Sequence, residues 1–445
     1  MGTFPHIPQA AVLLDPGVLE AYCHDESHLV GPLPLAVVKP HGPEALRELV
    51  RLAHSEGFAL VPRGAGTGKA GGAVPLARSV IVDLVDWPGA IEISKADATL
   101  RAPARMPLRD IKSAAQAQGL FYPPDPNSWD QCAFGGSLAT NAGGPGACKY
   151  GMTRHWVLAV EALMADGEIH AFGIATVKNN VGPSLAQLMV GSEGIFGLIL
   201  GATVRLIPAP QERLTLLLPV QDWHGLLELP SALVSAGLLP SAFEFWDPPV
   251  LALLRQYGPE EARRMPGKAL ALLEFDDPGC TTERFLERVM TVLGPLGDDL
   301  QSATDVRQRE ALWAVRRQTS VVLKERFPKK ISEDIVVPRS RIRDFFTAVE
   351  TLNLPLVTYG HLGDGNLHVN FLQAGELSAE AMEAHLMSLF RLCLDLGGTL
   401  SGEHGIGLAK RDAFLRLADP YQIEALRALK HALDPANIFN PGKVI

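Results

Sequence analysis

The stretch "PRGAGTGKAGGA", Pro62 to Ala73, decides the fold, because glycines stand at positions 64, 66, 68, 71 and 72. Glycine-rich backbone can turn its N–H groups inward and form a cradle for phosphate oxygens. The stretch lacks the closing Gly-Lys-Ser/Thr of a Walker loop, and its glycines continue where a Rossmann motif would open a helix. A flexible surface loop is the alternative interpretation.

The residues around this loop predict an α/β arrangement up to about Pro208. "ALRELVRLAHSEG" (Ala45 to Gly57) repeats apolar residues at helical spacing and ends in glycine, which predicts a helix before the loop. "SVIVDLVDW" (Ser79 to Trp87) predicts a strand. "WVLAVEALMADGEIHAF" (Trp156 to Phe172) predicts two strands joined by a hairpin turn at Asp166-Gly167.

A change of texture follows at about Ala209. Prolines at 208, 210 and 219 mark a boundary, and strands then alternate with longer amphipathic helices to about Asn370. From about Ser378 the chain holds two helical patterns and the tail "LDPANIFNPGKVI". With 445 residues and a mass of 47.9 kDa, two or three domains are expected.

Composition and charge exclude several classes of protein. Hydrophobic residues make up 47% and charged residues 20%, which is ordinary globular composition. The net charge of -9 argues against nucleic acid or an anionic membrane face as the main partner. The apolar runs are too short for a transmembrane segment, and the N-terminus lacks signal-peptide features, so we expect a cytoplasmic protein. Five scattered cysteines without a Cys-x-x-Cys pattern predict neither an iron–sulfur cluster nor a disulfide framework.

A pair of histidines marks the first candidate site. In "HLGDGNLHVN" (His361 to Asn370) two glycines flanking an aspartate favour a tight turn between two strands. His361 and His368 then come together across the turn, an arrangement that suits a metal ion. A hairpin whose histidines are solvated or hydrogen-bonded is the alternative.

Two further glycine-rich blocks extend the argument from the first loop. They are "PPDPNSWDQCAFGGSLATNAGGPGACKYG" (Pro123 to Gly151) and "GSEGIFGLILGATVRLIP" (Gly191 to Pro208), and three such segments fit one extended ligand. Together with "NIFNPGK" (Asn437 to Lys443), they make nearly the whole chain resemble the vanillyl-alcohol oxidase and para-cresol methylhydroxylase (PCMH) superfamily. Within it, the chain is most similar to the FAD-linked D-2-hydroxyacid dehydrogenases, a family that includes the FAD subunit of glycolate oxidase, D-lactate dehydrogenase and D-2-hydroxyglutarate dehydrogenase.

This resemblance implies an α+β fold in three parts. Residues 1–208 would form a PCMH-type FAD-binding domain of two subdomains. Residues 209–405 would form a cap or substrate domain with an antiparallel sheet and flanking helices, and residues 406–445 would return to the FAD domain. Some relatives tether FAD through a histidine or cysteine near the pyrophosphate loop, but neither residue type stands between Val61 and Ala73. We therefore expect noncovalent FAD.

The resemblance also assigns cofactor residues. The Arg63 to Gly72 loop would hold the pyrophosphate, the second block would line the flavin and its ribityl chain, and the third would close the adenine or dimethylbenzene side. The residues implied for FAD are Pro62, Arg63, Gly64, Ala65, Gly66, Thr67, Gly68, Gly72, Ala73, Pro124, Asp125, Gly135, Gly136, Ser137, Thr140, Asn141, Gly144, Glu193, Gly194, Gly197, Ile199 and Asn440.

In the resembling dehydrogenases, the motif "SGEHGIG" (Ser401 to Gly407) joins the paired histidines. His361, His368 and Glu403 would then make a two-histidine, one-carboxylate site for a divalent metal, with zinc, manganese and iron(II) all compatible. A bound cation would lower the pKa of the substrate hydroxyl, and His404 would accept its proton while flavin N5 takes the hydride. A helix-capping glutamate beside a core histidine is the alternative.

The substrate carboxylate needs its own partner. In "LWAVRRQTSVVLKERFPKKISEDIVVP" (Leu312 to Pro338) the first part predicts a helix on which Arg316 and Ser320 share a face. The resemblance puts Arg316 on the carboxylate, with Ser320 and Lys330 in support, because arginine binds carboxylates in a fork. A solvated Arg316 with Arg317 as the true contact is the alternative. The segment "KKISEDIVVP" departs from the tyrosine-rich pattern of the hydroxyglutarate enzymes and favours the glycolate and lactate branch.

We therefore expect an FAD-dependent dehydrogenase that oxidises a small D-2-hydroxy acid to the 2-oxo acid. The resemblance implies an electron acceptor outside the chain, either an iron–sulfur partner subunit or a quinone, cytochrome or electron-transfer flavoprotein, with peripheral membrane attachment through a partner as one outcome. Two alternatives stay open. One is a metal-free flavin oxidase or ether-lipid synthase on the same fold, and the other is a zinc hydrolase that uses the His361, His368 and Glu403 set.

Overall fold

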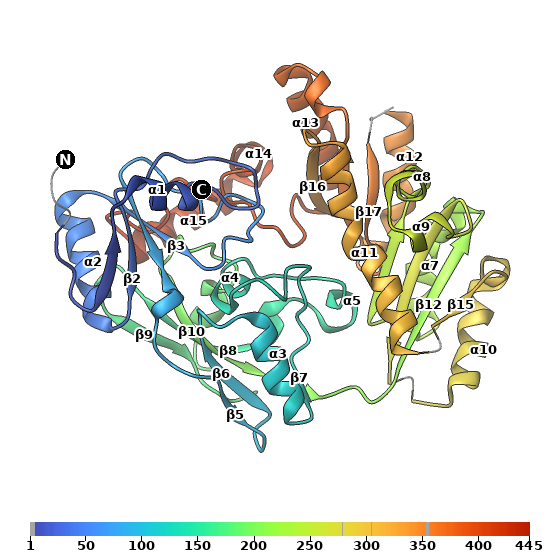
Figure 1. Cartoon of the computed structure of the whole chain (residues 1–445), viewed down its shortest axis with the longest axis horizontal. Helices are drawn as coiled ribbons and strands as arrows, with labels where there is room; N and C mark the ends of the chain where they lie inside the picture. The colour runs from blue at the N-terminus through green and yellow to red at the C-terminus, as the bar shows by residue number, and fades with distance from the viewer. Residues whose placement is uncertain (1–4, 278, 304, 353–355) are drawn as a thin grey trace. The chain divides into compact units, whose positions relative to one another are not determined.

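The computed structural model describes residues 5–277, 279–303, 305–352 and 356–445 (Figure 1). The chain forms two compact units, and each is assembled from separate stretches of sequence. Unit 1 comprises Met1–Gly143, Met152–Ala209 and Glu403–Ile445, and unit 2 comprises Gly144–Gly151 and Pro210–Gly402.

Unit 1 contains a small sheet with the strand order β1-β2-β4-β3. β2, β4 and β3 are parallel, and β1 is antiparallel to β2. The strands are β1 (Ala10–Leu13), β2 (Ala36–Pro40), β3 (Ala59–Arg63) and β4 (Ser79–Asp83). The connection from β2 to β3 is the helix α2 (Pro43–Glu56), which begins at a proline and ends at Gly57 in the left-handed conformation. Both termini follow the ordinary preferences of helix ends, and the glycine end is the one that the sequence predicts.

A second, antiparallel sheet of unit 1 has the order β5-β6-β10-β8-β9. Its strands are β5 (Glu92–Ser94), β6 (Thr99–Pro103), β8 (Val157–Leu163), β9 (Ile169–Gly173) and β10 (Leu198–Arg205), and β7 (Leu120–Phe121) pairs separately with β11 (Ile207–Pro208). One hydrophobic core joins Leu46 and Leu49 of α2, Val82 of the small sheet and Leu200 of the second sheet to Phe439 of the tail. The C-terminal tail is therefore part of the core of unit 1.

The remaining helices of unit 1 are shorter or lie at its C-terminal end. They are α1 (Pro16–Leu19), α3 (Leu108–Ala117), α4 (Phe134–Ala139), α6 (Leu185–Met189), α14 (Arg411–Leu417) and α15 (Pro420–Leu433), with the 3-10 turns η1 (Glu20–Tyr22), η2 (Leu84–Asp86) and η3 (Thr153–His155).

Unit 2 is built on an antiparallel sheet, called here the large sheet, whose order is β15-β12-β14-β13-β17-β18-β16. Its strands are β12 (Arg213–Val220), β13 (Ala242–Trp246), β14 (Ala269–Asp276), β15 (Gln301–Ser302), β16 (Ile331–Val336), β17 (Val357–His361) and β18 (Asn366–Phe371). The helices are α5 (Ala147–Tyr150), α7 (Trp223–Ser235), α8 (Pro248–Tyr257), α9 (Glu260–Arg263), α10 (Thr282–Leu293), α11 (Val306–Arg326), α12 (Ile342–Thr351) and α13 (Ala379–Asp395), and the 3-10 turns are η4 (Gly294–Gly297), η5 (Arg339–Arg341) and η6 (Ala374–Glu376).

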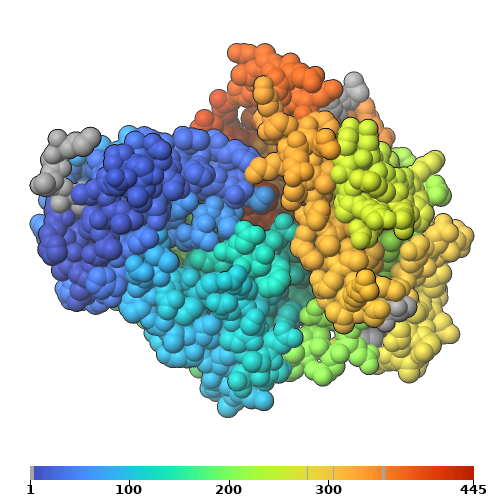
Figure 2. Space-filling view, in the orientation of Figure 1, coloured from blue at the N-terminus to red at the C-terminus, as the bar shows by residue number. Residues whose placement is uncertain are grey.

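Helices cover both faces of the large sheet. On one face, Leu254 of α8 and Leu323 of α11 share a core with Leu272 of β14, and α8, α9 and α11 lie together in Figure 1. On the other face, the Phe245 ring lies 5.9 Å from that of Trp223 in α7. The exposed residues of α11 are mostly polar, and the helix forms part of the surface of unit 2 in Figure 2. Alternate residues along each strand therefore belong to opposite cores.

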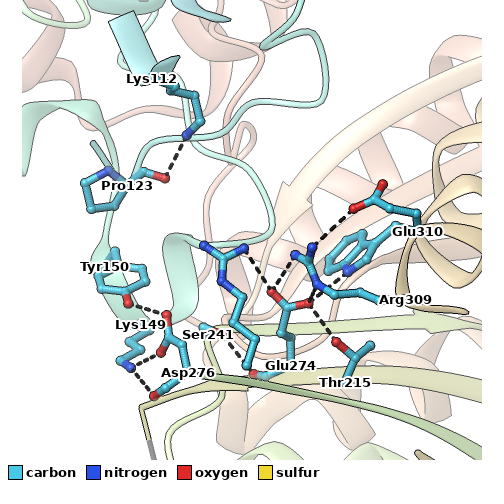
Figure 3. A network of polar contacts seen from close by, with 12 residues as sticks. Lys112, Pro123, Lys149, Tyr150, Thr215, Ser241, Glu274, Asp276, Arg309 and Glu310 are labelled. Carbon is cyan, nitrogen blue, oxygen red and sulfur yellow. Dashed lines mark hydrogen bonds and ion pairs between the residues drawn. The ribbon is translucent and has the colours of Figure 1, made fainter. Parts of the chain in front are cut away.

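Two buried carboxylates on β14 anchor neighbouring segments of unit 2 (Figure 3). Glu274 accepts hydrogen bonds from Arg309 Nε at 2.7 Å and from Trp313 Nε1 at 3.0 Å, both on α11. Asp276 accepts from Lys149 and Tyr150, which fixes α5 to the large sheet. This anchoring explains why residues 144–151 pack with unit 2 although the second glycine block continues into them.

The α+β class is confirmed, and the structure adds details that periodicity did not indicate. Where the sequence shows two helical patterns after Ser378, the structure has three helices, α13, α14 and α15. α14 is only seven residues long, which is too short for a periodic pattern to stand out. None of the helices in the described ranges combines the length and apolar character needed to cross a membrane.

Candidate functional site

The three glycine-rich blocks come together in unit 1. Gly64 of the first block lies against the second, since a Cβ placed on it would come within 3.1 Å of Ala133 Cβ. The third block is hydrogen-bonded to the second, because the backbone N of Glu193 donates to Ala139 O at 2.8 Å. The segments that the sequence assigns to one extended ligand therefore meet at one place in the fold.

The first loop follows β3 and needs glycine for two reasons. Gly66 has φ +74°, and a Cβ there would lie 2.6 Å from a terminal nitrogen of Arg63. Arg63 in turn donates to His24 O at 2.8 Å, which holds its guanidinium beside the loop. Gly194 of the third block approaches so closely that a Cβ would lie 2.9 Å from Pro62 Cγ. A backbone without side chains at these points leaves a cradle, which fits the pyrophosphate of FAD.

The C-terminal tail braces the end of this loop. Lys443 Nζ donates to Gly72 O at 2.8 Å and to Val74 O at 2.7 Å, and Asn440 Nδ2 donates to Gly72 O at 3.2 Å. Burial lowers the pKa of Lys443 to about 7, against the opposing effect of nearby carboxylates. Asn440 therefore acts on the loop backbone in this structure, alongside a lysine that the sequence analysis did not single out.

Glu193 connects the third glycine block to the motif that contains His404. Its Oε1 accepts from the backbone N of Ile406 at 2.8 Å. Gly405 lies so close that a Cβ there would come within 2.9 Å of the Glu193 carboxylate. Burial raises the pKa of Glu193 to about 7, although backbone hydrogen bonds from Ile406 and Gly407 oppose the rise. The carboxylate of Glu193 thus fixes the backbone just after His404.

The second block owes its shape to local hydrogen bonds. The hydroxyls of Ser137 and Thr140 donate to carbonyls of their own short helix at 2.8 and 3.0 Å. Asn141 has φ +50°, and its Oδ1 accepts from Arg154 N at 2.8 Å. A Cβ on Gly135 would lie 2.6 Å from Ala104 Cβ. These contacts set the backbone of the block.

The other residues implied for FAD fall in both units. Lys112 Nζ donates to Pro124 O at 2.7 Å and to Pro123 O at 3.5 Å, which fixes the segment before Asp125 (Figure 3). Gly197 lies close to β8, and Ile199 is buried in β10. The remaining ones are Ala65, Thr67, Gly68 and Ala73 in the first loop, Gly136 in α4, and Gly144, which belongs to unit 2.

The paired histidines lie on the β17–β18 hairpin of unit 2. His361 is opposite Asn366, and His368 is opposite Tyr359, so the two histidines are diagonal neighbours on one face of the large sheet. Their ring centroids are 5.0 Å apart, with an interplanar angle of 80°. The hairpin therefore brings the two imidazoles together, as its glycine-framed turn predicts.

A buried carboxylate joins one histidine to the arginine of α11. Glu244 of β13 is 0% exposed, and its Oε1 lies 2.5 Å from His361 Nδ1. Its Oε2 accepts from Arg316 Nε. Burial raises the pKa of Glu244, but Arg316 and His361 outweigh that effect and hold it below its ordinary value. Glu244 is therefore an ionised carboxylate with one partner on each oxygen.

The second histidine has polar and aromatic neighbours of its own. His368 Nδ1 lies 3.9 Å from Asp334 Oδ1, and its ring centroid is 5.3 Å from that of Tyr359. Asn366 Nδ2 donates to Asp334 Oδ1 at 2.6 Å. The Arg316 guanidinium carbon lies 5.0 Å from the centroid of the Tyr359 ring. A carboxylate beside the Nδ1 atom of each imidazole is the usual surrounding of metal-ligating histidines, so the donor set fits a divalent metal.

The residues predicted for the substrate carboxylate differ in exposure. Arg316 is 5% exposed, whereas Arg317 is exposed and pairs at 3.3 Å with a carboxylate of its own helix. Ser320 Oγ donates to Arg317 O at 3.5 Å. Lys330 Nζ donates to Asn370 Oδ1 at 2.9 Å, at the β16–β18 edge of the large sheet. Arg316 and Lys330 therefore both approach the region of the sheet that holds the histidines.

Glu403 and His404 belong to unit 1, whereas the two histidines belong to unit 2. Glu403 Oε2 lies next to Gly143, where a Cβ would come within 3.3 Å of it. His404 Nε2 lies 3.9 Å from Glu403 Oε1. The three-residue ligand set of His361, His368 and Glu403 stays a prediction, as does the role of His404.

Sequence reasoning missed Glu244, Asp334 and Tyr359. A usable signal exists for Glu244, because "AFEFW" places one acidic residue within an otherwise apolar and aromatic strand. A charged residue at such a position is rarely buried without a partner. Asp334 lies in "ISEDIV", which has two adjacent acidic residues, and the sequence alone does not indicate which of them points toward His368.

Two family models match the chain. The FAD binding domain matches residues 34–173, and the C-terminal domain of FAD linked oxidases matches residues 209–444. Among solved structures, an alkyldihydroxyacetonephosphate synthase has a TM-score of 0.72 at 17% identity, covering 97% of this chain and 82% of that one. A 4-ethylphenol oxidase from Gulosibacter chungangensis has a TM-score of 0.74 at 16% identity, covering 97% and 94%. These structures show a shared fold.

Curated relatives align along almost the whole chain. Glycolate oxidase subunit GlcD of Bacillus subtilis (strain 168) is 32% identical over 433 residues, which is 95% of this chain and 91% of that protein. A D-lactate dehydrogenase of Archaeoglobus fulgidus is 33% identical and covers 96% of each chain. A D-2-hydroxyglutarate dehydrogenase of Xanthomonas citri pv. viticola is 31% identical, covering 98% of this chain and 95% of the relative.

The fold, the converging glycine blocks and these matches define a flavoprotein oxidoreductase. The chain belongs to the family of FAD-linked oxidases, with an FAD binding domain and the C-terminal domain of that family. The zinc hydrolase alternative is therefore set aside.

Proposed function

We propose that the chain oxidises a small D-2-hydroxy acid of the glycolate or D-lactate type to the corresponding 2-oxo acid. The observation that carries this proposal is that His361 and Arg316 both contact Glu244, with His368 beside His361 on the same face of the large sheet. Such a cluster combines nitrogen donors for a cation with a guanidinium for a carboxylate. The names of the glycolate oxidase and D-lactate dehydrogenase relatives support the same substrate class.

In this proposal unit 1 holds FAD without a covalent bond, and unit 2 is the cap domain that binds substrate. The first loop would contact the pyrophosphate, and the second and third blocks the rest of the cofactor. When bound, FAD supplies a hydride acceptor at N5 of its ring. The chain contributes a fixed backbone cradle, braced by Asn440 and Lys443, so that the cofactor loop does not need to order when FAD binds.

We further propose that His361, His368 and Glu403 hold a divalent metal, with zinc as the first choice and manganese or iron(II) as alternatives. A cation held there would polarise the substrate hydroxyl. His404 would accept the hydroxyl proton as a neutral imidazole. Arg316 would bind the substrate carboxylate, and Ser320 and Lys330 would support it.

The electrons must leave the reduced flavin for an acceptor outside this chain. We propose a partner subunit with an iron–sulfur centre, or a carrier such as a quinone, cytochrome or electron-transfer flavoprotein. Nucleic acid is not a proposed partner, because the net charge is -9. A cytoplasmic location, with membrane attachment only through such a partner, is part of the same proposal.

The test is a substrate screen on the purified protein with an artificial dye acceptor. Glycolate and the D and L forms of lactate and 2-hydroxyglutarate are compared, and the metal content is measured on the same sample. We expect dye reduction with glycolate or D-lactate, and little with the L form. Equal rates with both forms of lactate, or a rate that is highest with D-2-hydroxyglutarate, would overturn the proposed substrate class.

Chelation separates the metal-assisted proposal from a metal-free oxidase or ether-lipid synthase on the same fold. Dialysis against a chelator should abolish dye reduction, and added zinc or manganese should restore it. Full activity after complete removal of metal would favour the metal-free alternative.

A further inference from the structure

Glu244 has a role that the family match does not assign. It lies on β13, directly opposite His361 on β17, and each of its carboxylate oxygens contacts a different group of the proposed site. We infer that Glu244 is a positioning residue that fixes the tautomer of His361 and the orientation of Arg316 at the same time. This inference rests on the proposed function for the meaning of both partners, although each contact is observed within unit 2.

The first half of the inference follows from hydrogen-bond geometry. The Arg316 guanidinium, which is always charged, donates to one oxygen of Glu244, so this carboxylate acts as an acceptor and the hydrogen at the His361–Glu244 contact belongs to His361 Nδ1. A neutral imidazole protonated at Nδ1 carries its lone pair at Nε2. Nε2 is therefore the atom of His361 that can ligate a metal. Glu244 selects this tautomer already in the metal-free protein.

The second half concerns the direction of the arginine. Glu244 accepts from Nε, on the side edge of the Arg316 guanidinium, and Tyr359 lies 5.0 Å from the guanidinium carbon. Because Glu244 uses Nε of the side edge, the end edge, formed by the two terminal nitrogens, is the edge left to form a fork with a second carboxylate. The contacts of the planar guanidinium with Glu244 and with the Tyr359 ring together hold this edge in a fixed direction.

Glutamate suits this position in charge and in hydrogen-bonding character. Its negative charge balances Arg316 in a place with no exposure to water. The side-chain amide of a glutamine would offer the two partners one acceptor oxygen and one donor nitrogen. It would then either face Arg316 Nε with an N–H group or drive the proton of His361 from Nδ1 to Nε2.

The neighbouring strand supplies a matched control. Glu274 of β14 is also buried on this sheet, and it is also hydrogen-bonded to an arginine of α11 (Figure 3). Its partners, Arg309, Trp313 and Thr215, have no proposed task in binding or catalysis. Glu274→Gln therefore measures the effect of disturbing a buried ion pair in this unit without touching the proposed site.

The experiment compares the parent, Glu244→Gln and Glu274→Gln as full-length holoproteins. Zinc binding after chelation is measured by calorimetry with zinc alone. The affinity for oxalate, a non-reactive dicarboxylate, is measured on metal-free protein from the flavin absorbance. Nitrogen-15 NMR of labelled histidines, with His361→Gln used for assignment, gives the tautomer of His361 in metal-free protein.

We expect His361 of the parent to be protonated at Nδ1, and Glu244→Gln to lose that tautomer. Zinc affinity should fall by about ten- to a hundredfold, the usual effect of removing a partner of a metal-ligating histidine. Oxalate affinity should fall by about tenfold or more, as expected for a disturbed arginine fork. Glu274→Gln should lower thermal stability while leaving both affinities and the tautomer unchanged.

The results also separate this inference from the proposed function. A parent in which His361 is protonated at Nε2, or a Glu244→Gln protein with parental zinc and oxalate affinities, would overturn the inference. Equal losses of both affinities in Glu274→Gln would overturn it as well, because the effect would then be general loss of structure. If the expected tautomer and affinity changes appear while no 2-hydroxy acid is oxidised, the positioning role stands and the proposed substrate class fails.

Discussion

At the scale of single residues, the neighbours Glu403 and His404 have different proposed tasks, and substitution should separate them. Glu403→Gln should lose metal and activity together, with partial recovery in excess metal. His404→Asn should keep both metal and FAD while lowering the rate of flavin reduction by roughly a hundredfold or more, the usual scale for a positioned base. Stopped-flow flavin reduction, with metal content measured on each variant, tests both. Flavin reduction at the parental rate in His404→Asn would show that the base is another group.

Glu193 gives a pH-dependent prediction. Its pKa in the folded chain is about 7, above the ordinary value of 4.5, so the folded state holds a proton that the unfolded state releases between these values. The contribution to stability is therefore complete below about pH 4.5 and is lost as the pH rises through about 7. Thermal unfolding of the holoprotein should show the midpoint falling over this range, and falling less in Glu193→Gln. Parallel curves for the two proteins would show that Glu193 titrates normally.

The contacts of some site residues could be predicted from the sequence, and those of others could not. His361 and His368 could be predicted to meet, because two glycines in their turn leave few backbone solutions. Glu244 could not be connected to Arg316 in advance, since 72 residues separate them and the pairing depends on how α11 packs on the large sheet. Local patterns specify which side chains share a face of an element, but not which element covers that face.

At the scale of elements, Gly365 is one of the glycines on which the β17–β18 hairpin depends. Gly365 has φ +79°, and a Cβ there would overlap the carbonyl oxygen of Val337. Gly365→Ala should therefore cost roughly 2 kcal/mol or more of unfolding free energy and weaken metal binding, because both strain and overlap oppose the turn. Gly237→Ala is the control, since Gly237 has φ +69° with no atom within 4 Å of the added Cβ, and it should cost only about 1 kcal/mol. Urea unfolding of both variants gives the comparison, and equal losses would show that the overlap is relieved.

Elements with strong periodicity and clear ends could be predicted, and short ones could not. α2 has a regular apolar face and a glycine stop, and the structure has it over Pro43–Glu56. The β8–β9 hairpin likewise follows its Asp-Gly turn. α5 is only four residues long and is fixed by Lys149 and Tyr150 on Asp276, a carboxylate more than 120 residues away in sequence. Tertiary contact, rather than local preference, decides such a segment.

At the scale of the whole molecule, the mode of FAD binding can be tested directly. The first loop has no histidine or cysteine between Val61 and Ala73 that could form a bond to the cofactor. Acid precipitation of the purified protein should therefore release its FAD into the supernatant, where absorbance and fluorescence measure it. Yellow colour that stays with the precipitate after washing would mean that a side chain elsewhere forms a covalent tether.

The C-terminal tail has a consequence for synthesis of the chain. Leu60 N donates to Ile438 O at 2.7 Å, and Asn440 N donates to Leu60 O at 3.0 Å, so the tail runs beside β3. During translation β3 leaves the ribosome hundreds of residues before this partner exists. Until then its edge carries unpaired backbone groups, which can pair with other nascent chains. A ribosome that stalls before residue 438 therefore releases a product with an open β-strand edge, a natural substrate for chaperones and proteases.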